Sequence, residues 1–251
     1  WHEFYGYDRV YFDSALGIAG IIWPTGTPWV PSSSWANTAS MMTARNTNIV
    51  EMAPGSTLTI NTAATLRLIG DGSQALTLNQ AITIGDNLNV ASLTIGAGFT
   101  VTIDGDLTTT GAITVPATST LIVLGKVTSG GAITNAGTLT VGALDCKGAL
   151  DNTGAVSVTV NGDAYIEGLV TNTTGSITVY GNYTGAGNIT TTTGNVVVDG
   201  SFYTDGSLAS TSTGDYTIGG NCHIGTTISV VAGSVLTVVG ILEVGGAVTN
   251  V

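Results

Sequence analysis

Residues 176–194 read SITVYGNYTGAGNITTTTG, and residues 195–213 read NVVVDGSFYTDGSLASTST. The two blocks align without a gap. Each begins with apolar residues at alternate positions and then carries two glycines six residues apart. Alternation of this kind predicts a short, half-buried β-strand. A block that repeats along the chain predicts a stack of similar turns, because each turn must bury its apolar side against its neighbours.

The glycine pair recurs eight times from Phe99 onward, at a spacing close to the length of the two blocks. Glycine accounts for 36 of 251 residues, so eight consecutive matches are not expected by chance. The pairs are Gly105/Gly111, Gly125/Gly131, Gly142/Gly148, Gly162/Gly168, Gly181/Gly187, Gly200/Gly206, Gly219/Gly225 and Gly240/Gly246.

Three apolar segments in each repeat are predicted to point inward. The first precedes the first glycine, and the other two begin two residues after each glycine. Three strands separated by glycine corners make a triangular coil. Glycine is expected at the corners because it accepts positive φ and tight bends. The sequence therefore predicts an all-β fold: a right-handed parallel β-helix (β-solenoid) with about three short strands per 17–21-residue coil. The expected inward positions are Leu107, Val127, Leu144, Ala164, Tyr183 and Phe202 after the first glycine, and Ile113, Ile133, Leu150, Val170, Ile189, Leu208 and Val248 after the second.

The solenoid is predicted to span residues 57–251, with irregular coils at 57–98 and regular coils at 99–251. Strands of the irregular coils are expected at 57–60, 66–69, 76–78, 82–84 and 93–95. Ten or eleven coils would form a rod roughly 50 Å long, because paired strands lie about 4.8 Å apart.

Residues 1–56 differ in composition, since they hold all four Trp, all three Met and four of the five Pro. Residues 32–45 predict one short amphipathic helix with Ser34 as its N-cap. An open solenoid end exposes unpaired strand edges, so we interpret 1–56 as an N-terminal cap and attachment region. A separate small domain is the alternative. The expected attachment residues of the cap are Trp23, Trp29, Trp35 and Met42.

Charge and hydropathy argue against a nucleic-acid-binding protein and against a protein with membrane-spanning helices. A net charge of −11 with only five basic residues argues against nucleic-acid binding. No apolar run reaches the roughly 20 residues of a membrane-spanning helix. The chain begins at Trp1 and stops at Val251 within a coil, so we expect a processed form or part of a longer protein, or a last coil that docks on a neighbour.

Cys146 and Cys222 are predicted to be buried free thiols. Their coils are four steps apart, or roughly 19 Å along the rod. A disulfide needs Cα atoms within about 7 Å. No metal or other cofactor is expected, because two cysteines and two histidines, His2 and His223, lack the spacing of ligands.

A polysaccharide-cleaving solenoid would need carboxylates gathered on neighbouring coils. Asp104 and Asp106 flank a corner, where aspartate is favoured as a turn residue. Glu167 and Lys147 hold equivalent places on adjacent coils and predict a surface ion pair. We therefore expect no catalytic residue and no enzyme activity. The remaining acidic candidates are Asp163, Asp199 and Asp205.

Three tyrosines, Tyr165, Tyr180 and Tyr203, are predicted to face outward on nearby coils. Clustered exposed aromatic residues bind sugars or form subunit contacts. Isolated surface tyrosines are the equal alternative, so these residues are a possible contact surface only.

The N-terminal region carries a further pattern: Val10-Tyr-Phe-Asp13-Ser, then Gly17-Ile-Ala-Gly20, then Trp23-Pro-Thr-Gly-Thr27 and Pro31. It resembles the head of bacteriophage structural proteins in which V-Y-x-D-[ST] and G-x-A-G…P-x-G-T lead into a short helix and a β-helix. The resemblance covers roughly residues 10–60. It implies a virion component, such as a tail fibre or spike, a head fibre or a capsid decoration, and these proteins are often trimers.

The expected function is that of a non-enzymatic virion structural protein on the particle surface. Its solenoid would be a stiff rod for attachment or adhesion, joined to other virion proteins through the cap, with host surface glycans as a further candidate partner. Flat threonine-rich faces would favour a homotrimer. Two alternatives remain: a bacterial or archaeal cell-surface adhesin or extracellular filament subunit, and a polysaccharide depolymerase.

Overall fold

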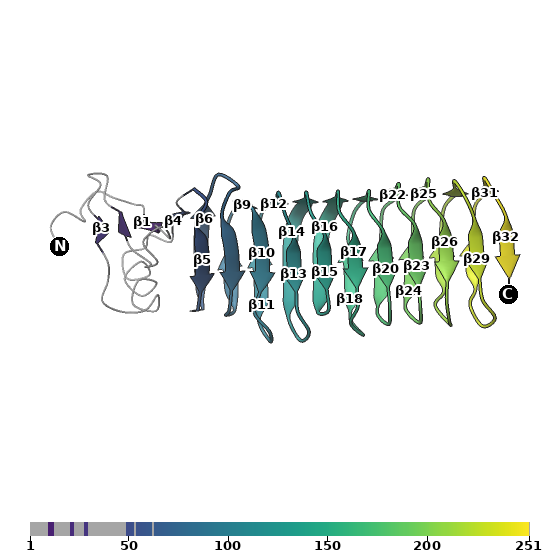
Figure 1. Ribbon diagram of the computed structural model, residues 1–251, viewed down its shortest axis with the longest axis horizontal. Helices are drawn as coiled ribbons and strands as arrows, with labels where there is room; N and C mark the ends of the chain where they lie inside the picture. Colours follow the sequence, from purple (N-terminus) through teal and green to yellow (C-terminus); the bar gives the residue numbers. More distant parts are fainter. Residues whose placement is uncertain are drawn as a thin grey trace.

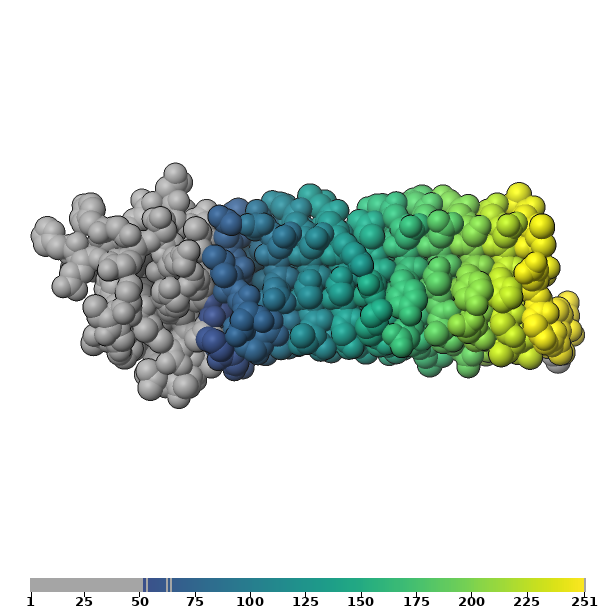
Figure 2. Space-filling model, turned by 90° about the horizontal axis from the view of Figure 1, so that it is seen from above, coloured from purple at the N-terminus to yellow at the C-terminus, as the bar shows by residue number. Residues whose placement is uncertain are grey.

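The computed structural model describes residues 10–12, 21–22, 28–29, 49–52, 54–61 and 63–250. Within these residues every regular element is a β-strand, and parallel pairing joins successive coils along one axis. Figure 1 shows the coils side by side from β5 to β32, and Figure 2 shows the same part as a rod of even width. The predicted β-solenoid is confirmed. The predicted helix at 32–45 lies outside the described residues, and the hand of the solenoid stays a prediction.

Each coil contributes one strand to each of three faces, which we call faces 1, 2 and 3. Two long strands, β14 (Thr120–Ser129) and β16 (Thr138–Cys146), run around the corner from face 1 to face 2 and join these faces into one sheet. Strand β6 (Ala64–Ile69) also pairs with strands of both faces. The other strands of face 1 are β8 (Ile82–Ile84), β11 (Thr100–Ile103), β18 (Ser157–Val160), β21 (Ser176–Val179), β24 (Asn195–Val198), β27 (Tyr216–Ile218) and β30 (Leu236–Val238).

Face 2 is built mainly from three-residue strands, and face 3 is a separate sheet of 11 parallel strands. At about 4.8 Å per strand, 11 strands span roughly 48 Å, which agrees with the expected rod. On face 2 lie β9 (Leu88–Val90), β12 (Leu107–Thr109), β19 (Ala164–Ile166), β22 (Tyr183–Gly185), β25 (Phe202–Thr204), β28 (Cys222–Ile224) and β31 (Leu242–Val244). On face 3 lie β5 (Thr57–Ile60), β7 (Ala75–Leu78), β10 (Ser92–Ile95), β13 (Ile113–Val115), β15 (Ile133–Asn135), β17 (Leu150–Asn152), β20 (Val170–Asn172), β23 (Ile189–Thr191), β26 (Leu208–Ser210), β29 (Ile228–Val230) and β32 (Val248–Asn250).

Parallel pairing extends into the part of the chain before residue 57. Strand β4 (Ile49–Met52) pairs in parallel with β6, and β1 (Val10–Phe12) pairs in parallel with β4. The short strands β2 (Ile21–Ile22) and β3 (Pro28–Trp29) form an antiparallel pair. The division at residue 56 between cap and solenoid stays a prediction.

The core consists of columns of equivalent residues. On face 3, Ile113 pairs with Ile133, which pairs with Leu150, and the column continues in register along the rod. The predicted inward positions on faces 2 and 3 are all buried except Val248, which is 62% exposed on the last described coil. Each buried aliphatic side chain contributes about 1.5–3 kcal/mol, so the columns are the main source of stability.

The repeated glycines have a different cause from the one the sequence suggested. Positive φ among the described glycines occurs at Gly55, Gly72, Gly98 and Gly233, none of which belongs to the eight pairs. At most of the paired positions the backbone of one coil lies directly on that of the preceding coil. A Cβ atom at Gly187 would lie 2.1 Å from the carbonyl oxygen of Gly168. The glycines are therefore required by close stacking of backbone on backbone.

A column of asparagines lies inside the core of face 3. Asn135, Asn152 and Asn172 are fully buried at the third position of their strands. The Nδ2 of Asn135 donates to Oδ1 of Asn152 (2.8 Å), and Nδ2 of Asn152 donates to Oδ1 of Asn172 (2.8 Å). The Nδ2 of Asn172 donates to the carbonyl oxygens of Gly175 and Asn195. Within the column each coil supplies a partner for the next, and only Oδ1 of Asn135, at the first asparagine, is buried without a hydrogen-bond partner.

Both cysteines are buried and free, as predicted. Cys146 lies at the end of β16, and its Sγ donates to the carbonyl oxygen of Gly148 (3.4 Å). Thr109 and Ser129 hold the equivalent inward place on the two preceding coils. Cys222 begins β28 and pairs in register with Phe202.

We expect both thiols to resist alkylation in the folded protein. Burial raises the pKa of Cys146 and that of Cys222 to about 11, and the thiolate is the reactive form. With a thiol-specific chromogenic reagent at about pH 8, the native chain should show negligible reaction, whereas an unperturbed thiol of pKa about 8.5 reacts readily. In concentrated guanidinium chloride both thiols should react. Rapid reaction of either thiol in the native chain would contradict the buried placement.

Candidate binding surface

The outer side of face 2 differs in composition from that of face 1. Outward positions of face 1 are mainly threonine and serine, whereas face 2 carries acidic and aromatic side chains over its C-terminal coils. In a three-residue strand the first and third side chains point inward, so the middle one points out. These middle positions pair in register from coil to coil, and we call them the aromatic row: Asp145, Tyr165, Thr184, Tyr203, His223 and Glu243.

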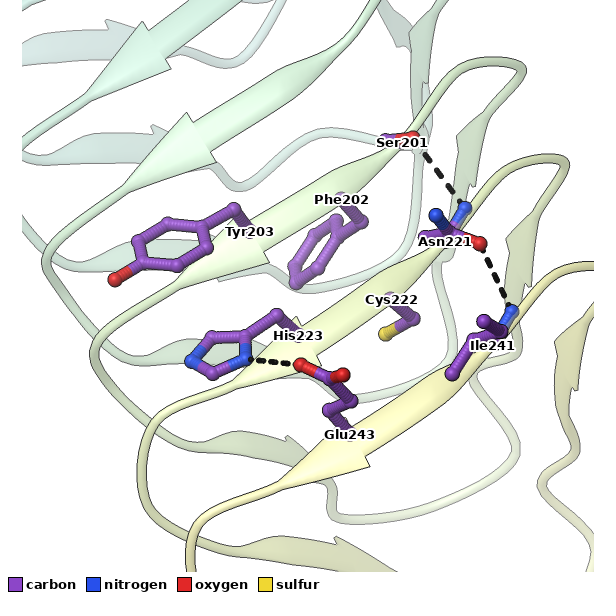
Figure 3. A pocket seen from close by; sticks show the side chains of 8 residues that line it. All are labelled: Ser201, Phe202, Tyr203, Asn221, Cys222, His223, Ile241 and Glu243. Carbon is purple, nitrogen blue, oxygen red and sulfur yellow. Dashed lines mark hydrogen bonds and ion pairs between the residues drawn. The ribbon is translucent and has the colours of Figure 1, made fainter.

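At the C-terminal end of the aromatic row, two rings are stacked on each other (Figure 3). The rings of Tyr203 and His223 lie 4.7 Å apart between centroids, at 6° to each other. The hydroxyl of Tyr203 donates to Oδ1 of Asp205 (2.6 Å), and this bond raises the pKa of Tyr203. The Nδ1 of His223 lies 3.3 Å from Oε2 of Glu243. Each ring is therefore held by its neighbour and by a carboxylate.

A second outward row runs beside the first, at the corner between faces 1 and 2. We call Asp163, Asn182, Ser201, Asn221 and Ile241 the corner row. Each backbone N–H after the first donates to the side-chain oxygen of the residue one coil before, at distances of 2.7, 2.9, 3.3 and 3.0 Å. This ladder fixes the corner row relative to the strands.

Between the two rows lies a hollow of about 250 Å³, shown in Figure 3, which we call the C-terminal hollow. Within the described part of the chain, Nε2 of His223, Oε1 of Glu243 and Nδ2 of Asn221 have no hydrogen-bond partner, so both donors and acceptors are available. Its lining residues are Ser201, Phe202, Tyr203, Asn221, Cys222, His223, Ile241 and Glu243.

A second hollow of about 350 Å³ occupies the equivalent place near the N-terminal end of face 2. Here Nε of Arg67 donates to Oδ2 of Asp86 (3.0 Å). The backbone N–H of Asp106 donates to Oδ1 of Asn87 (2.7 Å), which continues the same corner pattern. The lining of this hollow includes no aromatic side chain. It consists of Arg67, Leu68, Ile69, Gly70, Asp86, Asn87, Leu88, Asn89, Asp106 and Thr108.

The middle of face 2 carries a charged cluster around Asp145. Nζ of Lys126 lies 2.9 Å from Oδ2 of Asp145, and Nζ of Lys147 lies 3.3 Å from Oδ1. Burial alone would raise the pKa of Asp145, but hydrogen bonds from both lysines outweigh it and lower the pKa. Lys147 also lies over the ring of Tyr165, 4.4 Å from its centroid. Lys147 is therefore paired with Asp145 instead of the expected Glu167, which only raises the pKa of Lys147 through its charge.

The three predicted tyrosines do not form one cluster. Tyr165 and Tyr203 lie in the aromatic row, two coils apart, with Thr184 between them. Tyr180 directly follows β21 on face 1 and is 54% exposed. The sequence spacing did not reveal His223, Glu243 and Asn221 as neighbours of Tyr203. His223 and Glu243 lie three residues after Gly220 and Gly240, as Tyr203 lies three residues after Gly200, and this shared offset is the signal that could have shown it.

The predicted attachment residues are not placed by the structure. Trp23, Trp35 and Met42 lie outside the described residues. Trp29 ends β3, where its backbone pairs with Ile21, and its side chain is also outside the described part.

Several acidic candidates have structural partners. Oδ1 of Asp106 accepts the backbone N–H of Lys126 (2.7 Å), and Oδ1 of Asp163 accepts that of Asn182 (2.7 Å). Asp205 accepts the hydroxyl of Tyr203. No group of three or more His, Cys, Asp or Glu in the described residues could hold a metal ion. In the same residues no helix has the length and apolarity needed to cross a membrane.

Comparisons with protein-family models, with curated proteins and with solved structures find no match for this chain. Its function is therefore inferred from the fold and from the chemistry of face 2.

Proposed function

We propose that this chain is a non-enzymatic structural protein on the surface of a bacteriophage particle: a tail fibre or spike, a head fibre, or a capsid decoration. The observation that carries the proposal is the uninterrupted parallel stack from β5 to β32, in which every coil is bonded to the next. Such a stack is a stiff rod, suited to holding a contact surface away from a particle. The phage-like pattern between residues 10 and 31 supports attachment of the rod through its N-terminal region.

The roles of the carboxylates favour a structural protein over a depolymerase. Asp106 and Asp163 stabilise corners by accepting backbone N–H groups, and Asp145 is held between two lysines. A catalytic pair would need one carboxyl with a raised pKa close to an ionised partner. The hydrogen bonds and ion pairs of Asp106, Asp163 and Asp145 explain why these acidic residues occur at these positions, and no catalytic role is needed to explain them.

The threonine-rich outer side of face 1 supports a homotrimer. Thr102, Thr140, Thr159 and Thr178 occupy equivalent outward positions on its strands. Ile122 and Val197 also belong to this row, but most of its side chains are short threonines, which let two such faces approach closely over many coils. The mass in solution by light scattering should then be three times the chain mass of 25.2 kDa.

Immunogold electron microscopy tests the location of the protein. Antibodies raised against the solenoid should label the surface of intact phage particles. Labelling of bacterial or archaeal surfaces, or of free filaments, would replace the proposal with a cellular adhesin or filament subunit. New reducing or unsaturated ends after incubation with capsular polysaccharide would replace it with a depolymerase.

A further inference from the structure

We infer that the C-terminal hollow, between the aromatic row and the corner row, binds an uncharged hexopyranose ring of a glycan. The inference rests on the proposed function, in which the rod presents a contact surface, and it names the ligand and the residues of that contact. The observations that carry it are the stacked Tyr203 and His223 rings, the exposed Ile241 that lines the same hollow, and three unpaired polar atoms around it.

The hollow matches the two kinds of surface on a sugar ring. A pyranose presents patches of C–H groups and a rim of hydroxyls, so its site needs both apolar and polar surface. Ile241 is 64% exposed and Tyr203 is 41% exposed, and both line the hollow. The hollow of about 250 Å³ is close to the lower end of the range for small-ligand sites, which suits a single ring.

The hollow also supplies hydrogen-bonding groups of both kinds. A hydroxyl donates one hydrogen bond and accepts others, so a row of hydroxyls needs mixed partners. In the C-terminal hollow, Oε1 of Glu243 can accept and Nδ2 of Asn221 can donate. Nε2 of His223 can accept, because the contact with Oε2 of Glu243 places the ring proton on Nδ1. Among the described residues none of these three atoms is bonded elsewhere.

Hydrogen bonds and ring stacking hold Asn221, Tyr203 and His223 in place within the site. Asn221 is held at both ends by the corner ladder, since its N–H donates to Oγ of Ser201 and its Oδ1 accepts from the N–H of Ile241. Tyr203 and His223 are fixed by their stack and by Asp205 and Glu243. Side chains that are fixed before binding lose little conformational entropy, which favours a ligand that makes few contacts.

Other ligand classes fit face 2 less well. A peptide cannot add as a strand, because the backbone of β25 and β28 already pairs with the coils on both sides. Nucleic acids and anionic sugars are disfavoured by Glu243 in the hollow, by Asp205 bonded to the Tyr203 hydroxyl, and by the net charge of −11. An uncharged carbohydrate satisfies the apolar surface, the mixed polar groups and the charge together.

The test uses the full chain and defined oligosaccharides in solution. Malto-, manno- and galacto-oligosaccharides are the uncharged probes, and hyaluronan oligosaccharides are the anionic counterpart. Saturation-transfer NMR detects binding, and calorimetry gives the affinity. We expect at least one uncharged probe to bind, and Tyr203→Ala and His223→Ala each to weaken that binding about tenfold or more. The anionic probe should bind more weakly or not at all.

Tyr180→Ala is the matched control, because Tyr180 is another exposed tyrosine that does not line the hollow. It should leave binding unchanged, and all three variants should keep the melting temperature, since the replaced side chains point outward. The inference is overturned if no uncharged probe binds, if the anionic probe binds best, or if Tyr180→Ala weakens binding as much as Tyr203→Ala. Particle labelling is independent of this result, so the proposed function and the binding site can fail separately.

Discussion

Gly187→Ala is expected to lower the free energy of unfolding by about 3 kcal/mol or more, although the change adds a single methyl group. The new Cβ would lie 2.1 Å from the carbonyl oxygen and 2.5 Å from the carbonyl carbon of Gly168. Both are backbone atoms of the preceding coil, so no side chain can turn away to make room, and overpacking at a fixed backbone is destabilising. For a domain of this size the loss corresponds to a melting temperature lower by roughly 10 °C, measured by circular dichroism.

The matched control for this variant is Gly85→Ala. A Cβ at Gly85 would meet only Oδ2 of Asp104, at 3.9 Å, and its backbone does not have positive φ. Because alanine has fewer backbone conformations than glycine in the unfolded chain, the substitution should leave the free energy of unfolding unchanged or slightly raise it. Equal losses in the two variants would show that close stacking of coils does not explain the repeated glycines.

Asn152→Val is the second change for which we expect a large loss of stability. The substitution removes the middle amide of the buried column and leaves Nδ2 of Asn135 and Oδ1 of Asn172 without their partner. Each of these two buried groups should cost about 1–3 kcal/mol, and the two costs add. Thermal and urea unfolding should both report the loss, with the far-ultraviolet spectrum of the folded state unchanged.

The triple variant Asn135→Val, Asn152→Val and Asn172→Val separates hydrogen bonding from packing. It removes the whole column, so no amide is left buried alone, and a column of apolar residues replaces it. We expect the triple variant to be more stable than Asn152→Val alone. A triple variant that loses the sum of three single losses would mean that the shape of the side chains is what matters.

The fold could be predicted from the sequence because its signal is periodic. Leu150, Val170 and Ile189 keep the same offset from the second glycine, and the structure places them in one buried column. Strands β5 and β8 have the predicted bounds, while β6, β7 and β10 begin one or two residues earlier than expected. Strand β9 was not predicted, because its middle residue is the polar Asn89 and the strand is short.

Other features do not follow from one repeat alone. Alternation from Val170 would place Asn172 inside the coil, but the polar composition of 171–175 favours a closing loop, so the asparagine column was not predicted. The reason for the glycines is invisible in a single unit, since it lies in the contact between neighbouring coils. The shortest glycine spacing coincides with β14 and β16, where the strand runs through the corner and the register shifts between Val123 and Lys126.

The candidate site was predicted in part. Tyr165 and Tyr203 are outward on face 2 as expected, but Tyr180 belongs to another part of the surface. The neighbours of Tyr203 come from the next two coils along the chain, so only the register of the stack brings His223 and Glu243 to it.

The direction of pairing has a mechanical consequence. Bonds between β22, β25 and β28 join successive coils, so they point along the length of the rod. A force that pulls the two ends of the rod apart therefore breaks the hydrogen bonds between one pair of coils at a time. It does not act on the bonds of many coils at once. Each coil that unfolds adds roughly 60 Å of extended chain. The protein would therefore lengthen in discrete steps, and each step would dissipate part of the mechanical energy of a sudden pull.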